Sequence, residues 1–442
     1  MKKSMKLCSL LLVIVMIMGL VACGSNASES TGNNSSPSNT ASGNAVNLKV
    51  WAWDDNVPAV KSAAELYNSK TGSNIVLDVS TIGNAESREK LTTVLSAGDK
   101  DSLPDIVLME DTAIAQFVSS YKDAFVDMTD YNISWDKLVA SKTSLSVLED
   151  RHFAIPFDSG ASIACYRVDI LEQAGYTIKD LTDINWSTFI KIASDVYTKT
   201  GKYLLADNAK DMNVAKNILS ASDSSYFDSD GNVNFKDNKV MAEVLAVTKQ
   251  LVEAKALFLA GSWDEYIACL NDGTAAGVIN GGWIIGNIAE AKDQAGLWDI
   301  TNIPALEVAS GTHYTNSGGS SWLVMSKSKN TKDAINFLSE TICGSYAQEY
   351  WEKIAADTGY VTVYLPVLES GLYDNLEHEF YGKGVYSKIA ACAKDAPKMY
   401  ANKYFQEGYT TFVVAAANVL AGADINKELE NAQSAVEFTA GK

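Results

Sequence analysis

Residues 46–53 read VNLKVWAW, and residues 104–109 read PDIVLM. The first stretch alternates apolar with polar or aromatic residues, which is typical of a strand with one buried face. The second is a continuous apolar run after a proline, as in a strand that is buried on both faces. Between the two, residue spacing predicts a helix over 56–71, a strand over 75–79 and a helix over 87–97. Strands and helices that alternate in this way indicate a parallel sheet with helices on its faces.

A second α/β unit is predicted further along the chain. The elements indicated by the same periodicities are a helix over 186–198, a strand over 203–206, a strand over 275–280, a strand over 320–325, a helix over 331–342 and a helical tail over 404–438 with a break near Gly422. A chain of 442 residues is too long for one ordinary core. We therefore expect two domains.

Side chains suited to sugar binding stand at the predicted carboxyl ends of these strands. They are Trp53 and Asp54 after the first strand, Glu110 and Asp111 after the third, and Gly281, Gly282 and Trp283 after the strand over 275–280. Ligands of parallel α/β sheets bind at this edge of the sheet. An indole ring offers a flat apolar face to the C–H side of a pyranose, and a carboxylate accepts hydrogen bonds from its hydroxyl groups.

The N-terminus is typical of an exported lipoprotein. Three lysines precede an apolar run over 7–21, which is too short to span a bilayer comfortably. The run ends in LVACG at residues 20–24, which resembles a lipobox. We expect a signal peptide over 1–22, acylation of Cys23, and a flexible linker rich in Ser, Asn, Thr and Gly over 23–45. An ordinary signal peptide followed by an incidental cysteine is the alternative.

Charge and cysteine content argue against several classes of protein. The chain has 36 basic and 54 acidic residues and a formal net charge of −18, which disfavours nucleic acid and anionic membrane surfaces as partners. Four cysteines of the folded body lie far apart without a Cys-x-x-Cys pair: Cys165, Cys269, Cys343 and Cys392. We expect isolated buried thiols, with disulfides as the alternative, and no metal site, redox centre or cofactor.

Short motifs follow one another along the chain in a specific order. They are LPDIV at 103–107, FVDMT at 125–129, AIPF at 154–157, DILEQAG at 169–175, WSTF at 186–189, NDGTAAGVINGGW at 271–283, Gly318-Gly319, and LVMSKSKN at 323–330. Their order and spacing resemble those of the extracellular solute-binding proteins of carbohydrate ABC importers, relatives of the maltose-binding protein. The resemblance covers nearly the whole chain from Cys23 onward.

The resemblance implies a two-lobe, periplasmic-binding-protein-like α/β fold. Each lobe would be a mainly parallel sheet flanked by helices, and hinge crossovers would join the lobes. The implied bounds are 46–157 plus 313–365 for lobe 1 and 158–312 plus 366–442 for lobe 2, with crossovers near 156–159, 311–318 and 364–366.

The resemblance also implies a stacking platform at Trp283 and polar ligand contacts after the first and third strands and the first crossover. The candidate ligand-binding residues are Trp283, Trp53, Asp111, Asp158, Glu110, Asp54, Gly318 and Trp322. Each tryptophan has packing as its alternative, and Trp263 and Trp322 rank below the other two because core or rim positions are commoner for such residues. Arg167 stands where the family has asparagine; we expect it at the surface, the alternative being contact with an anionic sugar.

The sequence therefore predicts a monomeric, lipid-anchored receptor outside the bacterial cell membrane that binds a sugar or oligosaccharide and delivers it to ABC permease subunits. A secreted glycosidase that uses a carboxylate pair such as Glu110 and Asp158 is one alternative. Receptors for non-sugar solutes or for signalling are others. The three histidines are scattered, and no serine-hydrolase, zinc-protease or phosphate-loop motif occurs, so we expect no catalysis.

Overall fold

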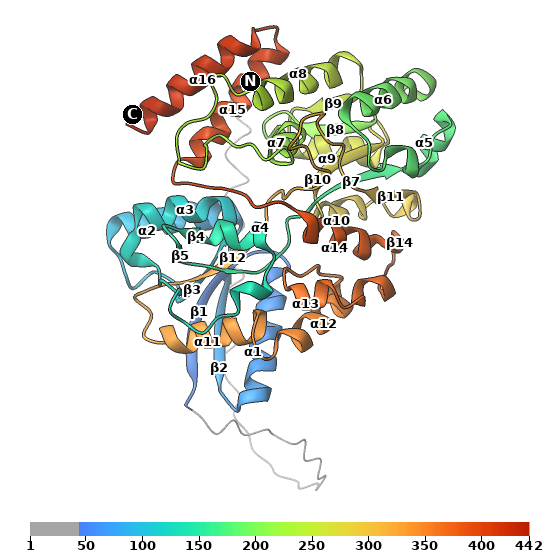
Figure 1. Ribbon diagram of the computed structural model, residues 1–442. Helices are drawn as coiled ribbons and strands as arrows, with labels where there is room; N and C mark the ends of the chain where they lie inside the picture. The colour runs from blue at the N-terminus through green and yellow to red at the C-terminus, as the bar shows by residue number, and fades with distance from the viewer. Residues whose placement is uncertain (1–43, 442) are drawn as a thin grey trace, which may run out of the picture. The chain divides into compact units, whose positions relative to one another are not determined.

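The structure is a computed structural model that describes residues 44–441 (Figure 1). The predicted signal peptide over 1–22, Cys23 and nearly all of the predicted linker over 23–45 lie outside the described residues. Both sheets described below belong to one compact unit of the chain, Ala41–Lys442. Within residues 44–441, no helix combines the length and the apolar character that crossing a bilayer requires.

The first sheet has the strand order β2-β1-β3-β12-β6. Its strands are β1 (Val46–Ala52), β2 (Ile75–Thr81), β3 (Ile106–Glu110), β6 (Ile155–Pro156) and β12 (Ser320–Val324). The helices that pack on it are α1 (Asn56–Thr71), α2 (Asn84–Ala97), α3 (Asp111–Ser120) and α11 (Thr331–Ile342). β1 pairs in parallel with β2 and β3, which confirms the predicted N-terminal unit.

Burial and capping explain why this unit forms at these residues. Leu48 and Val50 of β1 are fully buried, as their alternation predicts, and α1 covers the sheet with small apolar residues such as Ala59 and Ala63. α1 ends because Gly72 adopts a φ of 71° and its N–H donates to the carbonyl oxygen of Asn68 at 2.9 Å. Glycine takes this left-handed conformation without the steric cost that a side chain adds.

The second sheet has the strand order β11-β7-β10-β8-β9. Its strands are β7 (Ser162–Arg167), β8 (Leu205–Asn208), β9 (Leu257–Ala260), β10 (Gly277–Gly281) and β11 (Trp298–Thr301). Its helices are α5 (Val168–Ala174), α6 (Trp186–Thr200), α7 (Asn213–Ser220), α8 (Lys239–Glu253) and α9 (Trp263–Asn271). The strand predicted over 203–206 therefore begins two residues later, since Tyr203 makes only an isolated bridge to Ala275.

Strand pairing is more mixed than the predicted mainly parallel sheets. In the first sheet β12 is antiparallel to β3 and β6, and in the second β7 is antiparallel to β10 and β11. Each of the two sheets thus has two parallel and two antiparallel pairings within the described chain. The reason is that β7 and β12 are the strands with which the chain enters a sheet from the other one. The two-sheet α/β architecture itself is confirmed.

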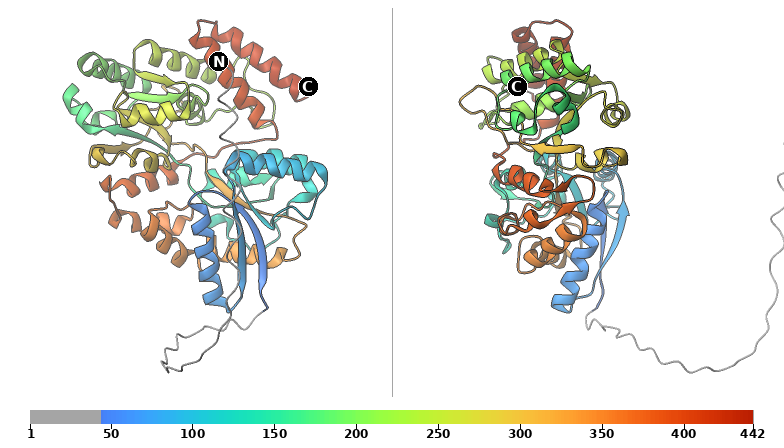
Figure 2. Two further views of the ribbon diagram at one scale, coloured as in Figure 1. Left: turned by 180° about the vertical axis from the view of Figure 1, so that it is seen from behind. Right: turned by 90° about the vertical axis from the view of Figure 1, so that its right-hand side faces the viewer.

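The remaining strands and α-helices of the described residues lie outside the two five-stranded sheets. They are α4 (Ala140–Thr143), β4 (Val147–Leu148), β5 (Arg151–His152), α10 (Ile284–Ile288), α12 (Ala347–Thr358), α13 (Leu365–Leu368), β13 (Glu377–His378), β14 (Gly382–Lys383), α14 (Val385–Asp395), α15 (Phe405–Leu420) and α16 (Ile425–Thr439). The last two helices pack on each other and on α8, as both views of Figure 2 show. They confirm the predicted helical tail with its break at Gly422, whose φ is 104°.

The four body cysteines are free and buried. Their burial confirms the predicted environment, and desolvation raises the pKa of each thiol, to about 12 for Cys269 and Cys343. A thiol with so high a pKa carries almost no thiolate at neutral pH, so these residues act as small apolar core groups.

Two of the connections between the sheets lie against each other. The chain leaves β6 through residues 157–161, and it returns to β12 through residues 315–319. Ala161 bridges Asn316 in antiparallel fashion, and Ser317 N–H donates to the carbonyl oxygen of Gly160. A Cβ atom at Gly160 would overlap the carbonyl group of Gly318. We call residues 157–161 the first crossover and residues 315–321, which include the first two residues of β12, the second crossover.

Gly160→Ala should lower the free energy of unfolding by about 1–3 kcal/mol, because the added methyl group must push the two crossovers apart. Urea denaturation measures this change. Gly286→Ala is the control, since a Cβ atom there meets no atom within 4 Å. Equal stability of the two variants would contradict the close approach of the crossovers.

Candidate functional site

Two tryptophans expose their rings next to each other. Trp263 begins α9 and is 38% exposed, and Trp283 follows β10 and is 47% exposed. Their ring centroids lie 6.1 Å apart with an angle of 32° between the planes. The chain has nine tryptophans, and the other seven are buried or half-buried. Exposed apolar rings that lie together are the kind of surface at which proteins bind ligands, so this pair is a candidate binding surface.

Contacts with the second crossover and with Tyr266 hold the two rings in place. The Trp283 indole N–H donates to the carbonyl oxygen of Ser317 in the second crossover at 3.2 Å. Gly281 permits this position, because a Cβ atom there would overlap the Trp283 ring. Trp263 packs on Tyr266 with ring centroids 5.4 Å apart, and the Tyr266 hydroxyl accepts a hydrogen bond from Asn280 at 3.3 Å. The two rings therefore form a fixed aromatic surface beside the second crossover.

The second crossover also carries an acid network. Asp158 of the first crossover accepts hydrogen bonds from the backbone N–H of Ser320 and from its hydroxyl, the latter at 2.8 Å. Ser317 and Ser320 are three residues apart, so their Cα atoms are at most about 10 Å from each other. Trp283, Gly318 and Asp158, which the sequence predicted as site residues, are thus gathered around one short segment.

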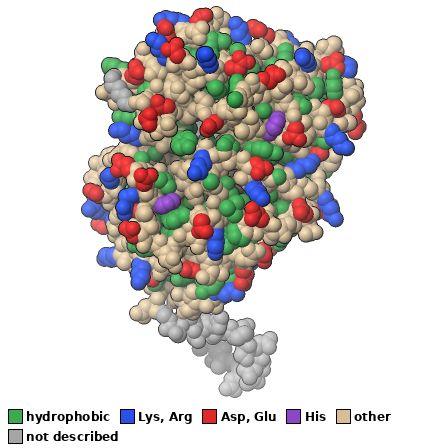
Figure 3. All heavy atoms as spheres, in the orientation of Figure 1, with side chains coloured by type: hydrophobic (Ala, Val, Ile, Leu, Met, Phe, Trp, Pro, Cys, Tyr) green, Lys and Arg blue, Asp and Glu red, His purple; other side chains and the backbone are tan. Residues whose placement is uncertain are grey.

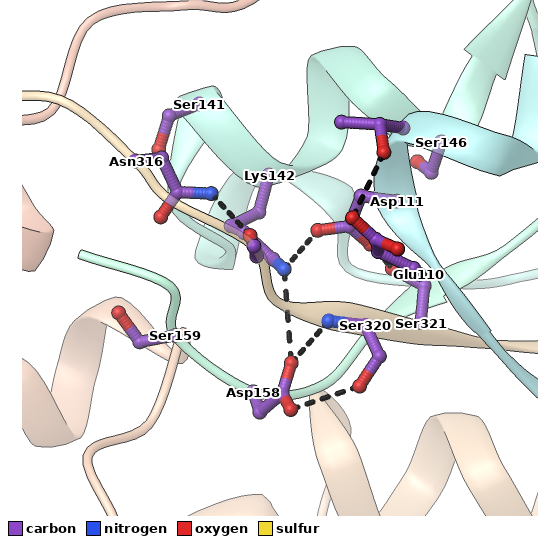
Figure 4. A network of polar contacts seen from close by, with 12 residues as sticks. Glu110, Asp111, Ser141, Lys142, Ser146, Asp158, Ser159, Asn316, Ser320 and Ser321 are labelled. Carbon is purple, nitrogen blue, oxygen red and sulfur yellow. Dashed lines mark hydrogen bonds and ion pairs between the residues drawn. The ribbon is translucent and has the colours of Figure 1, made fainter. Parts of the chain in front are cut away.

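Lys142 lies between two carboxylates of this network, as Figure 4 shows. Its ammonium group forms an ion pair with Asp111 and stands 3.8 Å from Oδ1 of Asp158. The other Asp111 oxygen accepts a hydrogen bond from the hydroxyl of Ser321 at 2.6 Å. Lys142 and Asp111 are essentially fully buried, whereas the Asp158 side chain keeps 21% of its surface exposed.

Burial dominates the electrostatics of Asp111. Desolvation raises the pKa of its carboxyl group to about 6, while Lys142 and the hydroxyl of Ser321 act in the opposite direction. A buried carboxylate needs such partners because an unpaired charge in the interior is costly. Since Lys142 and Ser321 occupy the oxygens of a fully buried side chain, Asp111 offers no accessible face to a ligand in this structure.

The other predicted residues lie in different surroundings. Glu110 is half-buried and accepts hydrogen bonds from Asn84 and Thr112, each at 3.1 Å. Asp54 is exposed in the turn before α1 with a φ of 47°. Trp53 is half-buried and packs on the core of the first sheet, as its alternative interpretation has it.

Trp322 lies in the core, which is the alternative to its predicted place in the binding site. Its side chain is fully buried in β12, which lies between β3 and β6 in the first sheet. Its ring packs edge-on against Phe157 with centroids 5.4 Å apart. A ring in this position cannot touch a solute without disrupting the sheet.

Arg167 lies at the opposite end of β7 from the crossovers. Ser162 and Arg167 are five positions apart, which is about 17 Å along a strand. The Arg167 guanidinium donates two hydrogen bonds to Asp169, at 2.8 and 2.7 Å, so its charge is neutralised locally. The Arg167 side chain is only 12% exposed, and its pairing with Asp169 at this distance argues against contact with an anionic ligand at the crossovers.

Sequence reasoning missed Lys142 and Tyr360. Lys142 belongs to a four-residue helix of polar and small residues, in which nothing distinguishes a buried lysine from a solvated one. Tyr360 donates to Asn56 at 2.7 Å and lies beside Asp158; burial raises the pKa of its hydroxyl group, and the charges of Asp158 and Asp55 raise it further. Tyr360 therefore connects the turn after β1 with the first crossover.

Lys142→Met should lower the free energy of unfolding by about 3–5 kcal/mol at neutral pH, because it leaves Asp111 buried without a counter-charge. The loss should be smaller at about pH 5, below the Asp111 pKa of about 6, because the native carboxyl group is then protonated in both proteins. Above that pH, folding of the variant must either bury the unpaired Asp111 carboxylate or keep its carboxyl group protonated, whereas the unfolded chain releases this proton. Both alternatives lower the free energy of unfolding.

Urea titrations at the two pH values measure this difference. Lys388→Met is the control, since it removes the half-exposed ion pair of Lys388 with Asp299 and should cost less than about 1 kcal/mol. A loss for Lys142→Met that does not change with pH would contradict the assigned role of Asp111.

Comparison with known proteins identifies the family. The family model described as bacterial extracellular solute-binding protein matches residues 62–379. A lactose-binding protein of Rhizobium radiobacter is 33% identical over 350 residues, which are 78% of this chain and 81% of that protein. An arabinooligosaccharide-binding protein of Bacillus subtilis is 24% identical over 347 residues, 76% of either chain.

Solved structures share the fold. The sugar-binding protein MalE of Xanthomonas citri superposes with a TM-score of 0.74 at 14% identity, over 90% of this chain and 98% of that one. An ABC transporter binding protein of B. animalis subsp. lactis, solved with β-1,6-galactobiose, gives a TM-score of 0.69 at 20% identity, over 90% and 98% of the two chains. With the family model and the lactose-binding relative each matching most of its length, the chain belongs to the bacterial extracellular solute-binding proteins.

Proposed function

We propose that the chain is the substrate-binding lipoprotein of an ABC importer and that it binds a small neutral oligosaccharide at the Trp263–Trp283 surface. The observation that carries the proposal is the exposed indole pair, fixed against a crossover that also holds the partly exposed carboxylate of Asp158. Apolar plates beside an anchored acceptor are what a pyranose ring requires, because one of its faces is apolar and its edge is lined with hydroxyl groups.

The relatives support this ligand class. The lactose-binding protein matches over 78% of this chain, and two arabinooligosaccharide-binding proteins match over 58% and 76% of it. Each of these names refers to a short neutral saccharide. Lactose is therefore the first probe, and arabino-oligosaccharides are the second.

The surroundings of Asp111 and Asp158 suit ligand binding better than glycoside hydrolysis. A glycosidase needs two carboxyl groups that can reach the bond to be cleaved. Asp111 is buried and paired with Lys142, and both oxygens of Asp158 accept hydrogen bonds from Ser320. These contacts hold the carboxylates in place as fixed acceptors, which suits a receptor.

In the proposed mechanism the ligand contacts both lobes and stabilises a closed arrangement of the domains over 46–157 plus 313–365 and 158–312 plus 366–442. The crossovers would serve as the hinge. The monomeric receptor, tethered outside the cell membrane through acylated Cys23, would then pass the sugar to permease subunits. Acidic and basic side chains are intermixed over the face shown in Figure 3, which fits a small neutral partner better than nucleic acid.

Trp283→Ala should weaken saccharide binding roughly 30-fold, about 2 kcal/mol, because a large aromatic contact is lost from the centre of the site. Titration calorimetry with lactose and arabino-oligosaccharides measures the affinity, and the melting temperature should change little because the ring is already half exposed. Phe438→Ala is the control: it removes an aromatic ring that is 86% exposed on α16. Unchanged affinity in Trp283→Ala would exclude the indole pair as the sugar site.

Cys23→Ser should release the protein from the membrane fraction into the medium, because only a thiol can receive the diacylglycerol anchor. Cell fractionation with immunodetection measures the distribution. Cys8→Ser, within the predicted signal peptide, is the control and should leave the protein anchored. Membrane retention of the Cys23→Ser variant would contradict lipid anchoring at this residue.

A further inference from the structure

Lys142 is an unusual residue in this chain because its charge is fully buried at the crossovers. Every other lysine or arginine that forms an ion pair within the described residues has a side chain at least 12% exposed, against 2% for Lys142. Its ammonium group also lies directly beneath Gly319, where a Cβ atom would overlap Nζ. Gly319 has a φ of 94°, so the bend of the second crossover is shaped around the lysine.

Lys142 reaches the binding surface only through other groups. Its ammonium stands behind Asp158, whose two oxygens are bound by Ser320. Ser320 belongs to the second crossover, and Ser317 in the same segment accepts the hydrogen bond of the Trp283 indole at 3.2 Å. Polar contacts therefore link the lysine to Ser320 and the exposed ring to Ser317, and the backbone of the second crossover joins these two serines.

Burial separates the two acids that Lys142 contacts. Asp111 is fully buried and serves as the counter-charge that lets the lysine stay in the interior. The Asp158 side chain keeps 21% of its surface exposed, and its Oδ1 lies 3.8 Å from the ammonium group. Ser320 and the Lys142 ammonium group hold the Asp158 carboxylate in one orientation. Ligand binding then loses less side-chain conformational entropy at Asp158.

We propose that Lys142 is a positioning residue for ligand binding, which holds Asp158 and the second crossover so that the carboxylate and the Trp283 ring face the ligand together. The proposal rests on the proposed function, since it assumes that this surface binds the saccharide. It assigns a binding role to a side chain that no ligand can touch.

The test separates positioning from simple stabilisation. Lys142→Met/Asp111→Asn removes the cation and its buried counter-charge together, so the interior holds no unpaired Asp111 anion, and the asparagine can still accept from Ser321. The double variant should regain most of the stability lost in Lys142→Met. Asp158, however, loses the ammonium group behind it in both variants.

Two measurements on the purified protein carry out this test. Lactose and arabino-oligosaccharide affinity by calorimetry should be at least tenfold weaker in the double variant than in the wild type. The indole N–H resonance of Trp283 in ligand-free protein, assigned with Trp283→Phe, should shift because its acceptor Ser317 has moved. The matched control is Lys388→Met/Asp299→Asn, the same exchanges in the pair that joins α14 to β11, which should change neither affinity nor resonance.

Wild-type affinity within twofold together with an unshifted Trp283 resonance in the double variant would overturn the proposal. Ser320→Ala is the second variant, for use if the double variant does not fold. It deletes the hydrogen bond from the Ser320 hydroxyl to Asp158 and should weaken saccharide binding and shift the Trp283 resonance. Unchanged affinity and an unshifted resonance in this variant would again overturn the proposal. A wild-type protein that binds no saccharide, with the Trp283 resonance still shifted by the double exchange, would refute the sugar ligand but not the coupling of Lys142 to Trp283.

Discussion

The close approach of two backbone segments, at Gly160 and Gly318, is the constraint on which the rest of the structure depends. A Cβ atom at Gly160 would overlap the carbonyl group of Gly318, so the two connections between the sheets run in direct contact there. Backbone hydrogen bonds and the Asp158–Ser320 contact then join them into one unit. The Trp283 indole, which follows β10, donates a hydrogen bond to Ser317 of this unit, so the exposed aromatic surface is anchored to the crossovers.

Charge and aromatic surface have distinct tasks in this arrangement. The buried pair of Lys142 and Asp111 contributes little net attraction after desolvation, but it fixes where the crossovers lie. The exposed indoles of Trp263 and Trp283 contribute apolar contact area that the folded chain leaves unused. A receptor that binds and releases its ligand needs both features, since a rigid acceptor gives specificity and an open aromatic plate gives affinity.

The sequence predicted the regular elements well because their determinants are local. Alternation defined β1, glycine caps defined the end of α1, and the helix over Thr331–Ile342 was predicted with the bounds it has. Trp283 was predicted to follow a strand at the sheet edge, and it lies directly after β10. The burial of Lys142 could not be predicted, because the groups around it, Asp111, Asp158 and Gly319, come from separate parts of the chain. The antiparallel entry of β7 and β12 was missed for the same reason.

A crystal structure of the protein with the saccharide that binds tightest in calorimetry tests the central claim most directly. The account predicts a sugar ring stacked on Trp283 or Trp263, with a ring hydroxyl donating to Asp158 and with Lys142 still paired behind that carboxylate. A saccharide bound away from both tryptophans, or one that leaves the crossovers without any contact, would contradict it.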